Sequence, residues 1–339
     1  MEQSGLGGNT GILIHVAANP ILGTGGLLRS LDFAQQWVEG GGNVVYLTRR
    51  LPNILVRQIA MAGCAADSVD IRPTEPHFAA SICQVAHDRK CEWIALDDSN
   101  EALIQQLIRE KSSDQRVLVL GRETPGVDFC TNGSPYFALI RRKLTLEKSE
   151  RSYDANARHC LLDFSKFSCD EVYELLESVS HRFHETGVVF EVVSPFASVA
   201  IDELRRKNES CRENFVGHHN PDRIFQSLYK LKLVLSTDEA SFYEAAYAGL
   251  PSVLLSNQQA TCNLPQDVTS LPWAVDCRQS DWMERTGAVM QELFSKRTRL
   301  STHARQMERL VDGFAASRLC RALNQHAESG GRVRSANPE

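Results

Sequence analysis

The residues best suited to chemistry follow a short apolar run in the second half of the chain. Residues 233–235 (LVL) predict a buried strand, residues 236–240 (STDEA) are small or polar, and residues 242–248 have helical spacing. A second apolar run over residues 252–255 predicts a parallel strand, so the unit is strand, loop, helix and strand. Its loop lies at the carboxyl end of the sheet, where the N–H groups and dipole of a helix bind phosphates. We expect the ligand site there.

A glycine-rich turn near the start of the chain is a second place where phosphate binding is possible. Residues 11–18 (GILIHVAA) predict the first strand, residues 19–26 (NPILGTGG) predict the turn, and a helix follows. Gly25 and Gly26 thus precede the N-terminus of a helix that carries Arg29 in its first turn. Glycines let a backbone approach a ligand, and they also form tight turns that bind nothing, so both interpretations stay open.

Two acids end another predicted strand. Asp97 and Asp98 follow the apolar residues 93–96, and residues 101–110 predict the next helix. Acids at the carboxyl end of a strand face the crevice of an open α/β sheet, whereas a short acidic side chain also caps a helix. We expect one of the two to cap and leave open whether the other meets a ligand.

The elements that position these residues alternate between strand and helix along the whole chain. With 339 residues the chain fits two domains, which we place at residues 11–152 and 153–325. Residues 122–150 predict the join, and a helix over residues 302–323 is long enough to pack back across the first domain. The predicted fold class is α/β, with two Rossmann-like domains facing across a cleft. Residues 1–10 and 326–339 are expected to be disordered.

Composition excludes several partners. The formal net charge is −5 and no long basic run is present, so we expect no nucleic acid. No apolar run approaches a membrane span of about 20 residues and no signal peptide is visible, so we expect a cytoplasmic protein with reduced cysteines. Cys83, His87 and Cys91 would share a helix face, but without a fourth ligand we predict no metal.

Three short stretches resemble GT-B nucleotide-sugar enzymes, most closely the UDP-sugar hydrolase of pseudaminic acid biosynthesis and its spore-coat relatives. More distantly they resemble the lipid II-forming N-acetylglucosaminyltransferase. The stretches are residues 23–29 (GTGGLLR), residues 133–141 (GSPYFALIR), and the set formed by residues 241–245 (SFYEA), 249–251 (GLP) and 257–258 (NQ). The resemblance implies a UDP-sugar as substrate or ligand, no required cofactor, and reaction at the anomeric carbon in surface-polysaccharide or nonulosonic-acid-type sugar biosynthesis.

The resemblance also implies roles for the third stretch. Glu244 would accept hydrogen bonds from the ribose hydroxyls, Ser241 beside Phe242 would hold phosphate, and Asn257 with Gln258 would contact sugar or phosphate. A local alternative exists, because a serine followed three residues later by a glutamate also forms a capping box at the start of a helix. In the same family a nucleotide base is held by main-chain contacts near the place of His218, and Gly25, Gly26 and Arg29 would form the first-domain loop.

The chain departs from the family at three places. Gly26 stands where the hydrolase has the histidine that handles the attacking water, and a glycine cannot move a proton. Asp238 and Glu239 replace a glycine pair, and each close carboxylate repels a diphosphate by about 1–4 kcal/mol. Residues 162–165 (LDFS) replace a glycine-rich loop. The pattern indicates a changed substrate, changed chemistry or lost chemistry.

Three functional hypotheses follow. The first is a UDP-sugar hydrolase or glycosyltransferase, in which Asp97 or Asp98 takes over the activation of the acceptor. The second is a GT-B scaffold without turnover that binds a nucleotide-sugar, a protein partner or a second copy of itself. The third is a different two-domain α/β fold such as an epimerase, which would need a catalytic pair of acids in the cleft.

Overall fold

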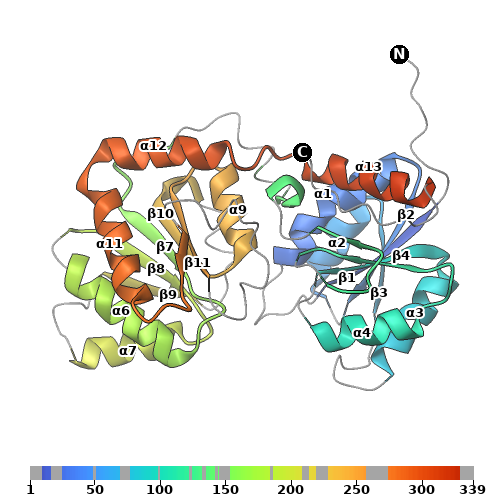
Figure 1. Cartoon of the computed structure of the whole chain (residues 1–339), viewed down its shortest axis with the longest axis horizontal. Helices are drawn as coiled ribbons and strands as arrows, with labels where there is room; N and C mark the ends of the chain where they lie inside the picture. The colour runs from blue at the N-terminus through green and yellow to red at the C-terminus, as the bar shows by residue number, and fades with distance from the viewer. Residues whose placement is uncertain are drawn as a thin grey trace, which may run out of the picture. The chain divides into compact units, whose positions relative to one another are not determined.

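The computed structural model of the chain describes most of its residues. They are residues 10–16, 25–48, 51–68, 77–97, 100–121, 124–131, 135–141, 144, 153–183, 186–207, 214–218, 228–256 and 274–328. The chain divides into two compact units (Figure 1). The first unit combines Met1–Arg142 with Phe314–Glu339, and the second is Lys143–Gly313.

The first unit contains a parallel sheet of six strands in the order β3-β2-β1-β4-β5-β6. Its strands are β1 (Gly11–Val16), β2 (Asn43–Thr48), β3 (Ala65–Ser68), β4 (Cys91–Asp97), β5 (Arg116–Val119) and β6 (Phe129–Cys130). Its helices are α1 (Gly25–Glu39), α2 (Asn53–Met61), α3 (Phe78–Asp88), α4 (Glu101–Glu110), η1 (Pro135–Phe137) and α13 (Ala315–Glu328). This is the Rossmann strand order, in which the crossovers change direction between β1 and β4.

Alternation along the strands gives this sheet two buried faces. Ile12 and Ile14 of β1 pack in a cluster with α1, α2 and α13, whereas Leu13 packs on the opposite face with α3 and α4. Successive side chains of a strand point to opposite faces, so a strand that is apolar throughout needs helices on both sides. Figure 1 shows these helix layers on the two sides of the sheet.

The second unit repeats the arrangement. Its sheet has the order β12-β11-β10-β7-β8-β9, which is the same Rossmann order when counting starts at β7. Its strands are β7 (His159–Asp163), β8 (Val189–Val193), β9 (Phe215–His218), β10 (Leu231–Ser236), β11 (Ser252–Ser256) and β12 (Ala274–Asp276). Its helices are α6 (Cys169–Phe183), α7 (Ala197–Lys207), η4 (Leu228–Lys230), α9 (Glu239–Tyr247), α11 (Trp282–Ser295) and α12 (Arg297–Glu308).

Two helix layers cover the second sheet as well. Side chains of α6, α7 and α11 and Leu300 of α12 share one core cluster with the strands, while α12 also packs against α9 and β11 (Figure 1). His303 of α12 is buried there and its Nε2 lies 2.8 Å from the carbonyl oxygen of Ser252. Two sheets with flanking helices confirm the predicted fold class of two Rossmann-like domains.

Several predicted boundaries differ from the structure. The helix expected over residues 302–323 is two helices, α12 and α13, because the chain turns at Gly313 with φ +81°. The chain leaves the second unit there, so α13 belongs to the first unit, whereas we had predicted a second domain running to residue 325. Residues 129–130 of the expected join form β6 of the first sheet.

Other predictions fall wholly or largely outside the described residues. They are the disordered N-terminus and most of the disordered tail, whose first residues, 326–328, belong instead to α13. Among the described residues, the strand paired with β2 is β3 at Ala65–Ser68.

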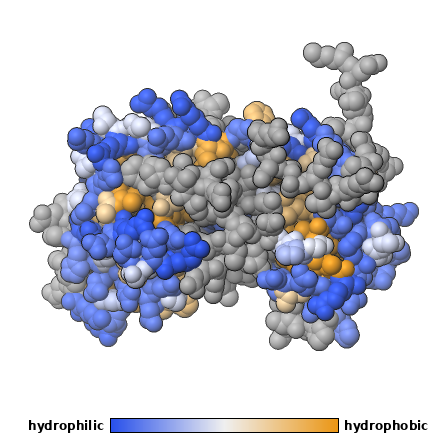
Figure 2. Space-filling model, viewed as in Figure 1, coloured by the Kyte–Doolittle hydropathy of each residue, from blue (hydrophilic) through white to orange (hydrophobic). Residues whose placement is uncertain are grey.

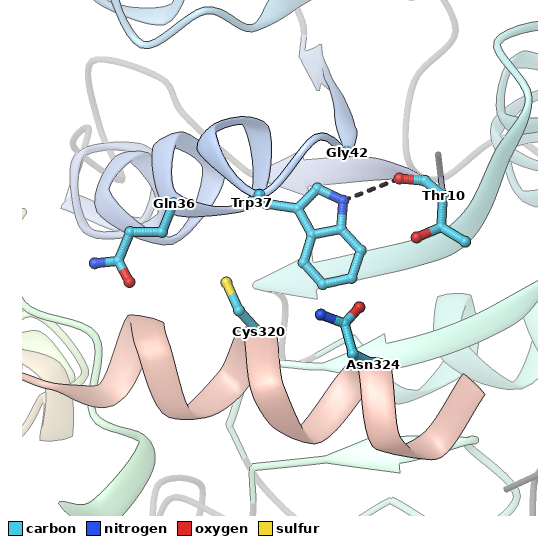
Figure 3. Close-up of a pocket in the computed structure, with 7 residues that line it drawn as sticks. Thr10, Gln36, Trp37, Gly42, Cys320 and Asn324 are labelled. Atoms are coloured by element: carbon cyan, nitrogen blue, oxygen red, sulfur yellow. Dashed lines mark hydrogen bonds between the residues drawn. The ribbon is translucent and has the colours of Figure 1, made fainter. Parts of the chain in front are cut away.

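The helix α13 packs along α1, as we expected for the last helix of the chain. Figure 3 shows Trp37 of α1 beside Cys320 and Asn324 of α13, with the indole N–H donating to the carbonyl oxygen of Thr10 over 3.0 Å. The small recess between these residues borders the start of β1, at the amino ends of the strands. Ligands of doubly wound sheets bind at the carboxyl ends, so we do not assign the ligand site to this recess.

His326 anchors the end of α13 among aromatic rings. Its ring lies 5.6 Å from that of Trp93 and 6.3 Å from that of Phe129. Burial and, secondarily, the charge of Arg116 lower the pKa of His326 below its ordinary value. The unfolded chain therefore binds this proton more readily than the folded protein does, and acid costs the folded state stability.

We expect His326→Phe to make the stability of the protein less sensitive to acid. With a lowered folded-state pKa, the contribution of His326 is fully present above about pH 6.5 and is lost as the pH falls below it. The phenylalanine keeps the ring packing and cannot be protonated. Urea unfolding at pH 7.5 and 5.5 measures the effect, and an equal loss of stability in both proteins would contradict it.

The surface of the described residues is mostly hydrophilic in the view of Figure 2. None of the helices described is both long and apolar enough to cross a membrane. The cytoplasmic location stays a prediction.

Candidate functional site

The carboxyl ends of β7 and β10 meet at the direction change of the second sheet. Asp163 ends β7 and is the register partner of Ser236, which ends β10. The chain leaves Ser236 through Thr237, whose N–H donates to the carbonyl oxygen of Asp163 over 2.8 Å, and then enters α9. The strand, loop, helix and strand predicted here are therefore present, and the loop lies where doubly wound sheets bind ligands.

Asp163 is a buried carboxylic acid at this point, with only 1% of its surface exposed. Its Oδ2 accepts a hydrogen bond from the hydroxyl of Ser236 over 3.2 Å, and its Oδ1 accepts one from the N–H of Ser165 over 3.2 Å. Burial, followed by the negative charge of Asp238, raises the pKa of Asp163 above its ordinary value. The environment therefore disfavours a negative charge on this group.

Asp238 caps α9 and forms an ion pair with Lys166. Its Oδ2 accepts hydrogen bonds from both the N–H and the hydroxyl of Ser241, each over 3.1 Å, and its Oδ1 lies 3.0 Å from Nζ of Lys166. The loop that carries Lys166 is tied to the same turn, because the N–H of Lys166 donates to Oγ1 of Thr237 over 3.3 Å. An aspartate at the cap satisfies N–H groups at the helix N-terminus that have no partner within the helix.

The cap corrects our local alternative for Ser241 and Glu244. The helix begins at Glu239, so Ser241 lies inside the first turn and Asp238 is the cap residue. Ser241 is buried, Phe242 is 2% exposed and edge-on to Tyr243, and Glu244 is 0% exposed. Contact of these side chains with a ligand stays a prediction.

Glu239 is the second acid at the start of α9. Burial and the charge of Asp238 raise the pKa of Glu239 to about 7, although Lys166 opposes the shift. Burial is the largest of these influences. A proton on Glu239 near neutral pH would reduce the repulsion that an anionic ligand meets at this helix.

We expect Glu239→Gln to change how stability depends on pH. Because the folded-state pKa of about 7 lies above the ordinary 4.5, the folded protein binds more protons than the unfolded chain between these values. The contribution of Glu239 is therefore fully present below about pH 4.5 and is lost as the pH rises to about 7. Relative to Glu239→Gln, the wild type should lose about 1–3 kcal/mol over this range in urea unfolding. Parallel profiles would contradict the prediction.

In the first unit, the carboxyl ends of β1 and β4 meet beside the N-terminus of α1. Asp97 ends β4 and is the register partner of Val16, which ends β1. Nη2 of Arg29 lies 3.9 Å from Oδ2 of Asp97. A Cβ added to Gly25 would lie 2.9 Å from Nη1 of Arg29 and 3.1 Å from Nη2 of Arg141, so two guanidinium groups flank this helix start.

Gly26 and Asp97 fit each other closely. A Cβ built on Gly26 would lie 2.0 Å from Oδ2 of Asp97, well inside van der Waals contact. The carboxylate thus occupies the space that any side chain at position 26 would enter.

The remaining predicted residues have different outcomes. His218 ends β9, and its Nε2 lies 2.6 Å from Oε2 of Glu191, whose Oε1 lies 2.7 Å from Nδ1 of His159. Its contact with a nucleotide stays a prediction. Asp98, Asn257 and Gln258 lie outside the described residues. The expectation that Asp97 or Asp98 caps α4 is wrong, because the cap is Asn100, whose Oδ1 accepts a hydrogen bond from the N–H of Leu103 over 3.2 Å.

The shared helix face considered for a zinc site does not form. Cys83 lies in α3, but Cys91 begins β4 after α3 has ended at Asp88. Within the described part of the chain, no group of three metal-binding side chains is arranged around a common point.

Sequence reasoning missed three residues of these two places. Asp163 ends a strand as Asp97 does, so the rule applied to Asp97 would have found it. Lys166 follows three residues later and carried no pattern of its own. Arg141 was noted only within a family stretch, and its burial at 8% exposure beside α1 has no local signal in the sequence.

Comparison with known proteins places the fold. No protein-family model and no curated protein matches the sequence. Among solved structures, the UDP-GlcNAc 2-epimerase from Neisseria meningitidis bound to UDP-GlcNAc has a TM-score of 0.66 at 10% identity, covering 93% of this chain and 100% of the other. A glycosyltransferase from Rickettsia africae has a TM-score of 0.59 at 11% identity, covering 94% and 98%. Alr3699/HepE from Anabaena, in complex with UDP and glucose, has a TM-score of 0.58 at 12% identity, covering 95% and 99%.

These likenesses establish the GT-B fold, with its two Rossmann-like domains, over nearly the whole chain. The resemblance is confirmed for the fold alone, and nothing in the comparisons singles out the pseudaminic acid hydrolase. The epimerase that we had considered as a different fold is a structural neighbour.

Proposed function

We propose that this protein binds a UDP-sugar and transfers the sugar from its anomeric carbon to an acceptor, which is water or a hydroxyl group. The observation that carries the proposal is the turn from β10 into α9, at the direction change of a GT-B fold, with Ser241 and Glu244 in the following helix. Solved neighbours of the same fold contain UDP-GlcNAc in one case and UDP with glucose in another.

In this proposal the second unit binds the nucleotide. The N-terminus of α9 and Lys166 supply positive potential for the diphosphate, which is the leaving group of the reaction. Glu244 accepts hydrogen bonds from the ribose hydroxyls. Its side chain is buried in the described structure, so ligand binding must expose it. Asn257 and Gln258 contact the sugar or phosphate. No redox cofactor is required for this chemistry.

The first unit supplies the acceptor side in this proposal. Asp97 activates the acceptor as general base, because its carboxylate replaces the side chain that Gly26 lacks. Nη2 of Arg29 lies 3.9 Å from that carboxylate and attracts it electrostatically. A polysaccharide or nonulosonic-acid-type sugar pathway would consume the product of either a hydrolase or a transferase of this kind.

Calorimetric titration with UDP tests the binding part of the proposal. We expect saturable heat with UDP and a weaker signal with ADP, followed by release of UDP when the protein is screened against UDP-sugars with and without an added acceptor. Binding without UDP release from any of them would favour a scaffold without turnover. No heat with any nucleoside diphosphate would rule out the nucleotide-sugar function.

A further inference from the structure

We propose that the Asp238 carboxylate occupies the position of a phosphate group and thereby lowers the affinity of the site for nucleoside diphosphates, with released UDP disfavoured most. This inference rests on the proposed nucleotide site, and in it Asp238 sets how strongly that site binds ligands of different negative charge. Asp238 is one of the positions where the chain departs from the family it resembles, so its effect is a property of this chain.

The groups that would bind a phosphate at α9 already hold the Asp238 side chain. The N–H and hydroxyl of Ser241 both donate to Oδ2, and the ammonium group of Lys166 lies 3.0 Å from Oδ1. A helix N-terminus, a hydroxyl group and a lysine are the donors that commonly surround bound phosphate. A ligand phosphate must displace the carboxylate or bind beside it.

The neighbouring charges add to this competition. Asp163 is buried beneath the turn, Asp238 interacts with it, and Glu239 begins the helix, so three acids surround the single lysine among these described side chains. Lys166 remains 40% exposed, which leaves it open to an incoming ligand. An anionic ligand that approaches Lys166 therefore meets the carboxylate of Asp238, which is ion-paired with it.

The consequence concerns the product more than the substrate. A UDP-sugar carries its diphosphate as a diester, whereas free UDP has an additional ionisable oxygen that titrates near pH 6, as phosphate monoesters do. UDP therefore carries the larger negative charge and is repelled more strongly by Asp238. The residue favours departure of the product from a site that must still bind its precursor.

Titration of the wild type and Asp238→Asn with UDP and with uridine tests this inference. Asparagine has the same shape and is an equally good cap residue, so α9 keeps its N-terminus. We expect the affinity for UDP to rise at least tenfold and the affinity for uridine, which has no phosphate, to stay within twofold. In the double variant Lys166→Met, Asp238→Asn, the gain for UDP should disappear because the unmasked cation is gone.

The matched control is Asp202→Asn on α7, which makes the same change at a side chain that is 74% exposed. It should leave both affinities unchanged. If the wild type binds UDP and Asp238→Asn binds it no more tightly, this inference is wrong while the proposed function stands. If the double variant keeps the gain, Asp238 does not mask Lys166. If wild type and Asp238→Asn bind neither ligand, the proposed function and this inference both fail.

Discussion

Asp97→Asn is expected to lower kcat by about 10²–10⁴-fold, with little change in KM, because an amide cannot accept the proton of the acceptor. The asparagine keeps the size of the side chain that packs against Gly26, so the start of α1 stays intact. The assay is UDP release, with the UDP-sugar that the screen identifies as the fastest substrate. A general base that acts only in the chemical step leaves substrate binding almost unchanged.

Asp88→Asn is the matched control, since Asp88 is an exposed acid at the end of α3 in the same unit. Its kcat should equal that of the wild type. The pH profile gives a second readout, because the acidic limb of kcat set by a carboxylate in the wild type should be absent in Asp97→Asn. A kcat for Asp97→Asn within threefold of the wild type would remove Asp97 from the reaction.

Glu244→Ala is expected to weaken UDP binding at least tenfold, or about 1.4 kcal/mol. A carboxylate that accepts two ribose hydroxyls contributes charge-assisted hydrogen bonds, and alanine accepts none. Calorimetric titration of both proteins measures the change. The affinity for uridine should fall by the same factor as the affinity for UDP, because the ribose is common to both ligands.

Two further variants separate a binding role from a structural one. Glu244→Gln keeps the volume of a side chain that is fully buried, so it should fold with a near-normal unfolding transition and still bind UDP more weakly. Glu284→Ala removes an exposed glutamate from the first turn of α11 and should change neither property. Unaltered UDP affinity in Glu244→Gln and Glu244→Ala would show that the buried acid serves the fold alone.

Strong local patterns predicted the elements of this fold well. The helix over residues 101–110 has the predicted bounds, because it has one apolar face and clear ends. The break between α12 and α13 was missed because Leu310 and Val311 continue the apolar spacing up to Gly313. Val311 is buried although it lies in a turn. A buried apolar residue in this turn therefore looks the same in the sequence as one on the buried face of a helix.

The site was predicted in location but less well in detail. Its place after β10 follows from a strand, a turn and a helix that are local in the sequence. The pairing of Lys166 with Asp238 and the fit of Asp97 against Gly26 each join residues that are about seventy positions apart. Such contacts depend on strand order, which no local pattern specifies.

The return of α13 to the first unit has a consequence for synthesis on the ribosome. The second unit is one continuous segment, so it can fold as soon as Gly313 has left the exit tunnel. The first unit begins earlier in the chain but lacks α13, and with it the residues that cover Trp37 and Trp93, until the segment after Gly313 has been made. Of the two units, the one whose synthesis begins first is therefore the one that finishes folding last.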